Sequence, residues 1–296
     1  MIISKYSKVR CVSRMSNNII LNRIFTQSIF MDLINKNENS LYDTCVRRYL
    51  RDTDYLENNQ LLTKLYEFMK KNYRNEYFYK NTLLNKLLLG RHSLNTTTAL
   101  SEIPINKSKA DFILINGKAI VYEIKTELDT LDRLDSQIRD YYKAFNHVCV
   151  VTCESNYKKL EELLNDSKVG ICVLTNRNTI STRKESTEDN SNLDHSTIFK
   201  ILRKSEFENI LIEHYGYIPK TSQVKFYKEC FKLFLEMDIN TVYKYFVKQL
   251  KMRNKIELEE YNKVPYELKF LMYFSNYNKN NYSKLFNFLN DKWGGS

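Results

Sequence analysis

The chain has 296 residues, of which 43% are hydrophobic, and it carries a formal net charge of +11 with only 6 Gly and 3 Pro. This hydrophobic share excludes an intrinsically disordered protein, and so few helix breakers disfavour a loop-rich all-β fold. No apolar run approaches the roughly 20 residues that span a membrane, and none of the 6 Cys forms a C-x-x-C pair, so we expect a cytoplasmic protein with buried thiols and no membrane partner.

The N-terminal third of the chain is predicted to be helical. Apolar residues return at three- and four-residue spacing in four segments, at residues 18–35, 41–52, 57–72 and 75–90. The fourth segment is the clearest, because Leu84 and Leu88 belong to one apolar stripe and Gly90 is a typical helix stop. We interpret residues 1–74 as a helical N-terminal arm and the fourth helix as the first element of a core.

The middle of the chain alternates between strand and helix patterns. Strands are predicted over 97–105, 109–115 and 118–125, and Asn116-Gly117 between the last two indicates a β-hairpin. The elements that follow are a helix, a strand, a helix and a strand, at 131–145, 147–153, 156–165 and 170–175. This order over residues 75–176 predicts an α/β fold with a mixed β-sheet core flanked by helices.

The last part of the chain divides into a polar and a helical stretch. Residues 177–195 are nearly free of large apolar side chains, which predicts a linker or an exposed excursion. Residues 196–296 are predicted to form a helical C-terminal domain, with helices at 196–214, 221–237, 240–254, 265–275 and 280–291.

Charge is distributed unevenly between these parts. Lys and Arg number 16 against 8 Asp and Glu in residues 1–97, 13 against 16 in residues 98–196, and 17 against 11 in residues 197–296. An acidic middle between basic arms suits a polyanionic ligand, because the arms bind phosphates while the carboxylates attract a cation. A Lys-rich surface that only keeps the protein soluble has the same signature.

Three ionisable residues of the predicted hairpin carry the functional hypothesis. Glu123 and Lys125 lie two residues apart on one strand and therefore share a face, while Ile120, Tyr122 and Ile124 are expected to point to the other face, into the core. A carboxylate and a lysine are costly to bury side by side without a purpose. An ion pair between them would be a purely structural explanation, but it would not account for Asp111 on the neighbouring strand.

The hairpin register decides whether the two acids meet. A strict two-residue Asn116-Gly117 turn sets Asp111 opposite Tyr122, whereas one more residue in the loop, or a bulge, sets Asp111 opposite Glu123. The hypothesis of a metal site requires the second geometry. The two carboxylates and the Ile124 carbonyl could then hold Mg²⁺ or Mn²⁺, with Lys125 beside the attacking water.

These residues resemble the PD-(D/E)xK nuclease superfamily. The likeness rests on Asp111, on Glu123-x-Lys125 and on Gln137-x3-Tyr141 in the following helix. The longer run YEIKTELDTLDRLDSQIRDYY, with ILRKSEFENIL further on, is similar to an uncharacterised bacterial family of that superfamily, named after a myxobacterial locus. The resemblance is specific over residues 98–153, looser to about 254 and absent from the first hundred; Ala110 stands where the superfamily has proline.

The resemblance implies a restriction-endonuclease-like core and a magnesium-dependent nuclease that acts most naturally on DNA. The catalytic residues would be Asp111, Glu123, Lys125 and Gln137, and the metal ligands Asp111, Glu123, Ile124 and one upstream acid. Glu76 and Glu102 both qualify as that acid; Glu76 is slightly preferred, and for each a solvated surface acid is an equal alternative. Such nucleases serve genome maintenance, mobile elements or phage defence.

Further residues are predicted to contact nucleic acid. They are Arg133 and Tyr141 beside the core, and Lys244, Lys248 and Lys251 along one helical face. A homodimer, and a protein partner held by the helical arms, are compatible with the sequence. The rival hypotheses are a non-catalytic nucleic-acid-binding or regulatory protein on the same fold, and a protein-interaction module.

Overall fold

The computed structural model describes residues 18–90, 93–253 and 256–294, which belong to two compact units. The helical unit consists of Met1–Asn85 together with Lys255–Ser296, and the sheet unit consists of Lys86–Asn254. The first and last parts of the chain therefore belong to one unit, whereas the sequence predicts an N-terminal arm at 1–74 and a separate C-terminal domain at 196–296. The basic segment before residue 18 lies outside the described residues.

The helical unit joins segments from both ends of the chain. Asn58 is buried and its amide donates hydrogen bonds to the carbonyls of Phe288 (3.0 Å) and Asp291 (3.1 Å). Its described elements are α2 (Leu21–Ile24), α3 (Gln27–Lys36), α4 (Ser40–Tyr49), α5 (Asn58–Asn72), α6 (Glu76–Leu83), α13 (Leu258–Lys263), the short 3-10 helix η2 (Tyr266–Leu268), α14 (Lys269–Phe274) and α15 (Lys279–Asn290).

Two predicted helices are each divided in the structure. The segment 18–35 contains α2 and α3, because Thr26 is extended (φ −122°) and its hydroxyl donates to the Arg23 carbonyl. The segment 196–214 contains α9 (His195–Ile201) and α10 (Lys204–Tyr215), separated by the extended Leu202 and Arg203. The segment 75–90 begins as α6 and continues as the π-helix η1 (Leu84–Leu89), and α13 was not predicted.

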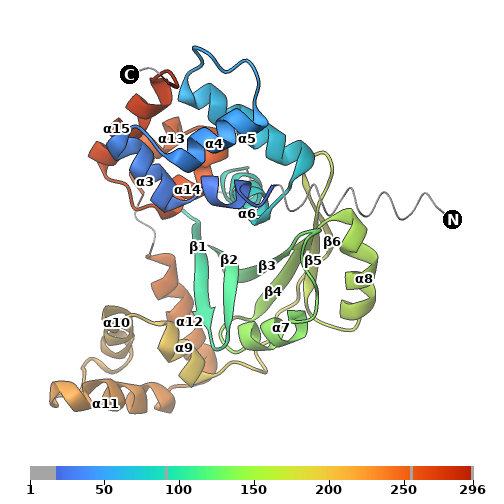
Figure 1. The fold of residues 1–296 in the computed structure, drawn as a ribbon. Coiled ribbons are helices and arrows are strands. Elements are labelled where there is room, and N and C mark those ends of the chain that lie inside the picture. Colours follow the sequence, from blue (N-terminus) through green and yellow to red (C-terminus); the bar gives the residue numbers. More distant parts are fainter. Residues whose placement is uncertain (1–17, 91–92, 254–255, 295–296) are drawn as a thin grey trace. The chain divides into compact units, whose positions relative to one another are not determined.

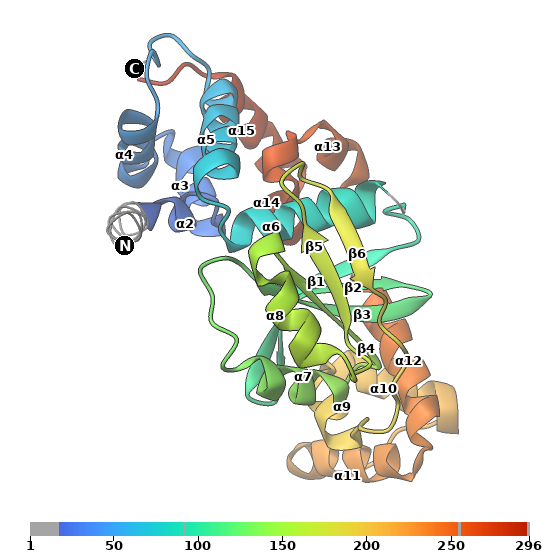
Figure 2. The same ribbon diagram turned by 90° about the vertical axis from the view of Figure 1, so that its right-hand side faces the viewer.

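The sheet unit contains one six-stranded mixed sheet, in which strand order follows chain order (Figures 1 and 2). The first three strands and the last pair are antiparallel, while β3–β4 and β4–β5 are parallel. The strands are β1 (Thr98–Ile105), β2 (Ser108–Asn116), β3 (Lys118–Lys125), β4 (His147–Thr152), β5 (Gly170–Leu174) and β6 (Ile180–Lys184). The predicted α/β class with a mixed sheet flanked by helices is confirmed.

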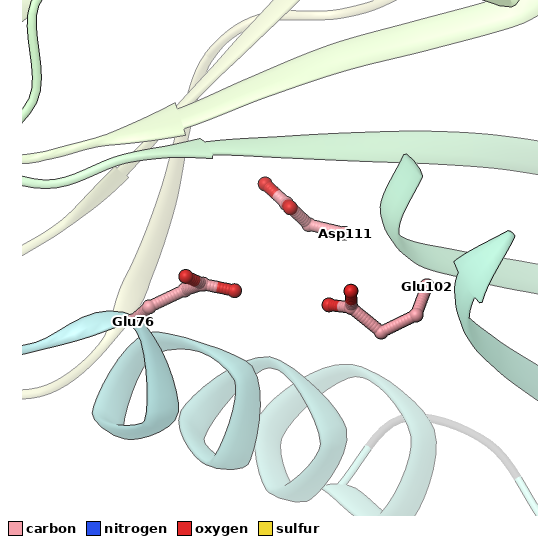
Figure 3. A group of neighbouring side chains, drawn as sticks. All are labelled: Glu76, Glu102 and Asp111. Carbon is pink, nitrogen blue, oxygen red and sulfur yellow. The ribbon is translucent and has the colours of Figure 1, made fainter. Parts of the chain in front are cut away.

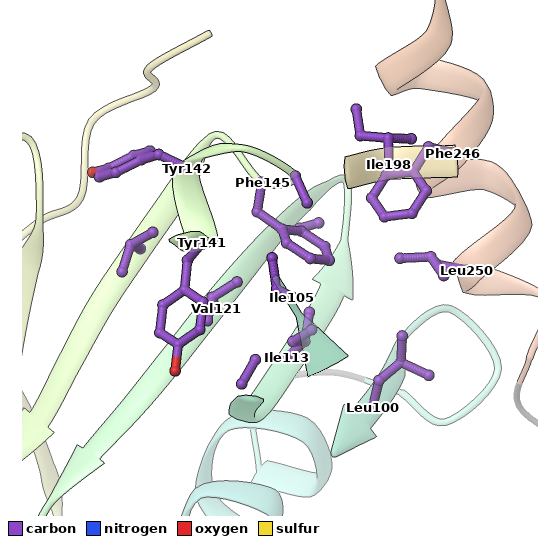
Figure 4. Close-up of a cluster of buried hydrophobic side chains, with 14 of the residues drawn as sticks. Leu100, Ile105, Ile113, Val121, Tyr141, Tyr142, Phe145, Ile198, Phe246 and Leu250 are labelled. Carbon is purple, nitrogen blue, oxygen red and sulfur yellow. The ribbon is translucent and has the colours of Figure 1, made fainter. Parts of the chain in front are cut away.

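Helices cover one face of this sheet around a single hydrophobic cluster (Figure 4). They are α7 (Leu134–Tyr142), α8 (Glu154–Leu164), α9 and α12 (Ile239–Lys251), and α10 and α11 (Gln223–Glu236) extend the cluster outward. On the sheet the cluster includes Ile113, Val121 and Val148, which share a face with Glu123 and Lys125. The sequence predicts the core on the opposite face of β3; the main core lies instead on the face of the site, and both faces of the strand are buried.

Strand β6 lies where the sequence predicts a polar linker. Its side chains after Ile180 are partly or fully exposed, as suits the edge of a sheet, and this exposure removes the apolar alternation that marks a strand. The strand is held by Lys184, whose ammonium donates to the carbonyls of Leu164 (2.5 Å) and Ser167 (2.6 Å) at the end of α8. Arg183 also pairs with Glu154 at the start of α8 (2.6 Å).

Two predictions about the chain as a whole can be compared with the structure. Among the described residues, no helix combines the length and the apolar character needed to cross a bilayer. The described cysteines are all buried, as predicted: Cys45, Cys149, Cys153, Cys172 and Cys230.

Candidate active site

The β2–β3 hairpin brings the first two predicted catalytic residues into line. Its register pairs Phe112 with Tyr122 and Asn116 with Lys118, so the next position sets Asp111 in line with Glu123. The turn residue between the strands, Gly117, has φ +71°, a left-handed conformation that a glycine adopts without steric cost. This is the register that the metal-site hypothesis requires, and it places both acids on one face of the sheet.

Glu123 is almost completely enclosed, with only 1% of its surface exposed. Its Oε1 accepts hydrogen bonds from the Lys125 ammonium (2.7 Å) and the Gln137 amide (2.6 Å). Its Oε2 accepts the Tyr141 hydroxyl (2.5 Å). A buried carboxylate requires such donors, because desolvation without them is costly.

Lys125 and Gln137 complete a closed set of hydrogen bonds around that carboxylate. The Lys125 ammonium donates to Glu123 and also to Gln137 Oε1 (2.9 Å). Gln137 lies on α7, one turn before Tyr141, so the same helical face presents both side chains to β3. The Lys125 backbone is fixed from the other side, because its carbonyl accepts the Thr152 hydroxyl of β4 (2.8 Å).

Tyr141 supports the site from inside the core. Burial, reinforced by the Glu123 and Asp111 carboxylates, raises the pKa of its hydroxyl far above the ordinary value. The hydroxyl therefore keeps its proton and can donate to Glu123; it also lies 3.0 Å from the Lys109 carbonyl. The sequence predicts Tyr141 among the nucleic-acid-binding residues, but its side chain is fully buried and its polar end contacts Glu123 instead of a surface.

Asp111 is held against the neighbouring strand and close to a second acid. Its Oδ2 accepts the backbone N–H of Ile124 (2.8 Å), so the carboxylate lies beside Glu123 along β3. One oxygen of Asp111 and one of Glu102 lie within 4.8 Å of each other (Figure 3). Glu102 falls in line with Asp111 in the β1–β2 register, which pairs Ser101 with Phe112 on one side of it and Ile103 with Ala110 on the other.

Glu102 adopts an unusual backbone conformation in the middle of a strand. Its φ is +59°, which is costly for a residue with a side chain and is seldom retained without support from its surroundings. Its exposed carboxylate forms an ion pair with Lys109. Lys109 is not among the predicted site residues, although its position two residues before Asp111 on β2 places both side chains on one face.

The remaining predicted site residues are not part of this hydrogen-bonded group. Glu76 begins α6 in the helical unit, where it pairs with Lys80 (2.6 Å), and its role as an additional ligand stays a prediction. Arg133 is exposed at the start of α7. Lys244, Lys248 and Lys251 lie exposed on α12, and Lys248 pairs with Glu213 (2.6 Å).

A known protein family matches the middle of this chain. The family model of bacteriophage P4 protein cII matches residues 69–269, more than half of the chain. No curated protein and no solved structure shows a significant match.

Proposed function

The chain belongs to the family of bacteriophage P4 protein cII, and we propose that it is a metal-dependent nuclease that hydrolyses phosphodiester bonds in DNA. The observation that carries this proposal is the alignment of Asp111 with Glu123 across the β2–β3 hairpin, beside Lys125 on the same face. Asp111, Glu123 and Lys125 are the acids and the amine of the PD-(D/E)xK pattern, and a hairpin slipped by one residue would have separated them.

The donor atoms around Asp111 suit a hard divalent cation. Mg²⁺ binds carboxylate oxygens, and two oxygens on opposite sides of the ion are about 4.2 Å apart. The oxygens of Glu102 and Asp111 lie within 4.8 Å of each other, so a small adjustment lets one ion contact both. Glu123 can add a further ligand through Oε2, which accepts the Tyr141 hydroxyl and keeps a second lone pair. When bound, Mg²⁺ or Mn²⁺ supplies a more acidic water and neutralises charge on the phosphate.

The side chains of the site have distinct roles in this proposal. Lys125 lies on the face of the two acids and donates a hydrogen bond to the phosphate or the attacking water, which stabilises negative charge as it develops. Gln137 bonds both Lys125 and Glu123 and so fixes their separation. Tyr141 holds Glu123 from the core side and contacts no substrate.

A cleavage assay tests the proposal directly. Purified protein is incubated with supercoiled plasmid, linear duplex and single-stranded DNA, with Mg²⁺, with Mn²⁺ or with EDTA. We expect cleavage only with metal, and a loss of about 100-fold or more in Asp111→Asn and Lys125→Ala. Asp166→Asn and Lys159→Ala change the same residue types at exposed positions of the sheet unit and should leave the rate unchanged.

Cleavage that Asp111→Asn leaves intact would point to a contaminating nuclease and would remove the support for this site. Absence of cutting on every substrate and with both metals would favour the second candidate function, a nucleic-acid-binding or regulatory protein on the same fold. One observation favours that candidate: the Glu123 carboxylate is already bonded by Lys125, Gln137 and Tyr141, a complete structural role for a buried acid.

A further inference from the structure

A surface away from the site combines exposed and partly exposed rings with lysines. It lies on α10, on α12 and on the residues that follow α10, all within the sheet unit. We call it the α10–α12 surface and define it by His214, Tyr215, Tyr217, Tyr245, Lys244 and Lys248.

The rings of this surface form a continuous chain. The ring centroids of Tyr217 and Tyr215 are 6.1 Å apart, those of Tyr215 and His214 are 4.6 Å apart, and those of His214 and Tyr245 are 5.9 Å apart. Tyr215 is anchored, because its hydroxyl donates to the Leu233 carbonyl of α11 (3.0 Å). Tyr217, in contrast, keeps 55% of its surface exposed. A ring with so much exposed area beside a fixed neighbour offers a face on which a flat ligand can stack.

The charge of the surroundings specifies the ligand further. Residues 195–253 contain 11 Lys and Arg against 6 Asp and Glu, whereas the sheet part that precedes them is acidic. Lys244 and Lys248 are exposed one turn apart on α12, on either side of Tyr245 in the chain. Lys248 also forms an ion pair with Glu213 of α10.

We propose that the α10–α12 surface binds single-stranded DNA, with unpaired bases stacked on the exposed rings and phosphates bound by Lys244 and Lys248. Rings with neighbouring ammonium groups recognise this ligand because every unpaired base has a flat face and every nucleotide has a phosphate. In a duplex the bases stack on each other, so they cannot stack on the rings of this surface. This inference rests on the proposed function only in taking DNA as the ligand.

Binding is measured by fluorescence anisotropy with a labelled 20-nucleotide oligo-dT strand, a duplex of mixed sequence and an oligo-U strand. EDTA is present throughout, so cutting plays no part, and a protein that cuts nothing can still bear out this inference. We expect the full chain to prefer oligo-dT, with affinity that falls steeply with salt. Tyr217→Ala should weaken oligo-dT binding by about fivefold or more and duplex binding by less than about twofold, and Tyr217→Phe should restore it.

Variants of the two lysines and of Glu213 should change the affinity for oligo-dT in opposite directions. Lys244→Glu with Lys248→Glu should weaken binding by about tenfold or more and reduce the salt slope by roughly 0.7 for each phosphate that these side chains no longer bind. Glu213→Gln should strengthen binding by about twofold or more, because it removes the acid that competes for Lys248. The matched control, Lys158→Glu with Lys159→Glu on α8, changes net charge equally and should have a much smaller effect.

Three results would each overturn the proposal: equal losses in the control and the α10–α12 variant, preference for duplex or RNA, or oligo-dT affinity that Tyr217→Ala leaves unchanged. An affinity for oligo-dT that does not fall with salt would likewise contradict the proposal, because Lys244 and Lys248 would then bind no phosphates.

Discussion

At the scale of single residues, Glu123 and Lys125 form a buried ion pair in the sheet unit. Their side chains are only 2% and 9% exposed and bond at 2.7 Å. Removing one partner leaves the other charge buried, so we expect Lys125→Met and Glu123→Gln each to lower the free energy of unfolding by about 3–5 kcal/mol. The double variant should lose much less than the sum, because no charge remains uncompensated. Urea unfolding of the four proteins completes the cycle, and additive losses would disprove the coupling.

A second buried ion pair predicts a dependence on pH. Glu206 and Arg253 are 9% and 8% exposed and bond at 2.6 Å. Burial raises the pKa of Glu206, but hydrogen bonds from Arg253 and from the Arg203 N–H outweigh this and leave the pKa below its ordinary value. The stabilisation is therefore complete above the unfolded pKa and is lost as the pH falls through the folded one.

We therefore expect Glu206→Gln to be clearly less stable than the parent at pH 7, with a difference that narrows once the pH falls below about 4.3, the ordinary pKa of a glutamate. The measurement is the urea midpoint of both proteins from pH 7 to pH 3. Glu213→Gln, which loses an exposed pair, should show little effect at any pH. A difference that stays constant down to pH 3 would mean that the carboxylate charge does not stabilise the fold.

At the scale of elements, β6 depends on a lysine that the sequence does not mark as structural. The Lys184 ammonium binds carbonyls at the C-terminal end of α8, where the helix dipole also favours a cation. Lys184→Met should destabilise the sheet unit by about 1–2 kcal/mol and reduce amide protection in β6. Hydrogen exchange with mass spectrometry measures amide protection in β6 and in α8. Lys159→Met is the control on α8; equal protection in the two variants would show that the interaction is unimportant.

Local patterns predicted the elements that bury one side and repeat regularly. Strand β3 was predicted with its observed bounds, and the two-residue spacing of Glu123 and Lys125 correctly placed both side chains on one face. The sequence permits two registers of the hairpin, because one more residue in the turn moves every side chain of the strand to the opposite face, and only the folded hairpin selects between them. The left-handed Glu102 has no signature in the sequence, since its conformation is imposed by its neighbours in three dimensions.

At the scale of the whole molecule, the sequence predicts a domain order that follows the chain, and the compact units do not follow it. The spacing of apolar residues predicts a helix, but it does not predict which distant helix packs against its apolar face. In the helical unit, α15 packs against α3 and α5, from the other end of the chain. The C-terminal residues also bond directly to the N-terminal part: the Trp293 N–H donates to the Leu56 carbonyl (3.0 Å), and its indole donates to Asp43 (2.9 Å).

This arrangement predicts that the two ends of the chain unfold together. Trp293 is the single tryptophan, so its fluorescence follows the helical unit alone. Asn58→Ala removes the buried amide that joins α5 to the Phe288 and Asp291 carbonyls, and it leaves the buried Tyr42 hydroxyl without its acceptor. We expect it to lower the free energy of unfolding measured by Trp293 fluorescence by about 2–3 kcal/mol.

The control for this prediction is Asn156→Ala in the sheet unit, which removes an amide bonded to the Thr126 carbonyl. It should leave the unfolding transition measured by Trp293 fluorescence unchanged. If Asn58→Ala also left this transition unchanged, an N-terminal arm independent of the C-terminal segment would be the better description.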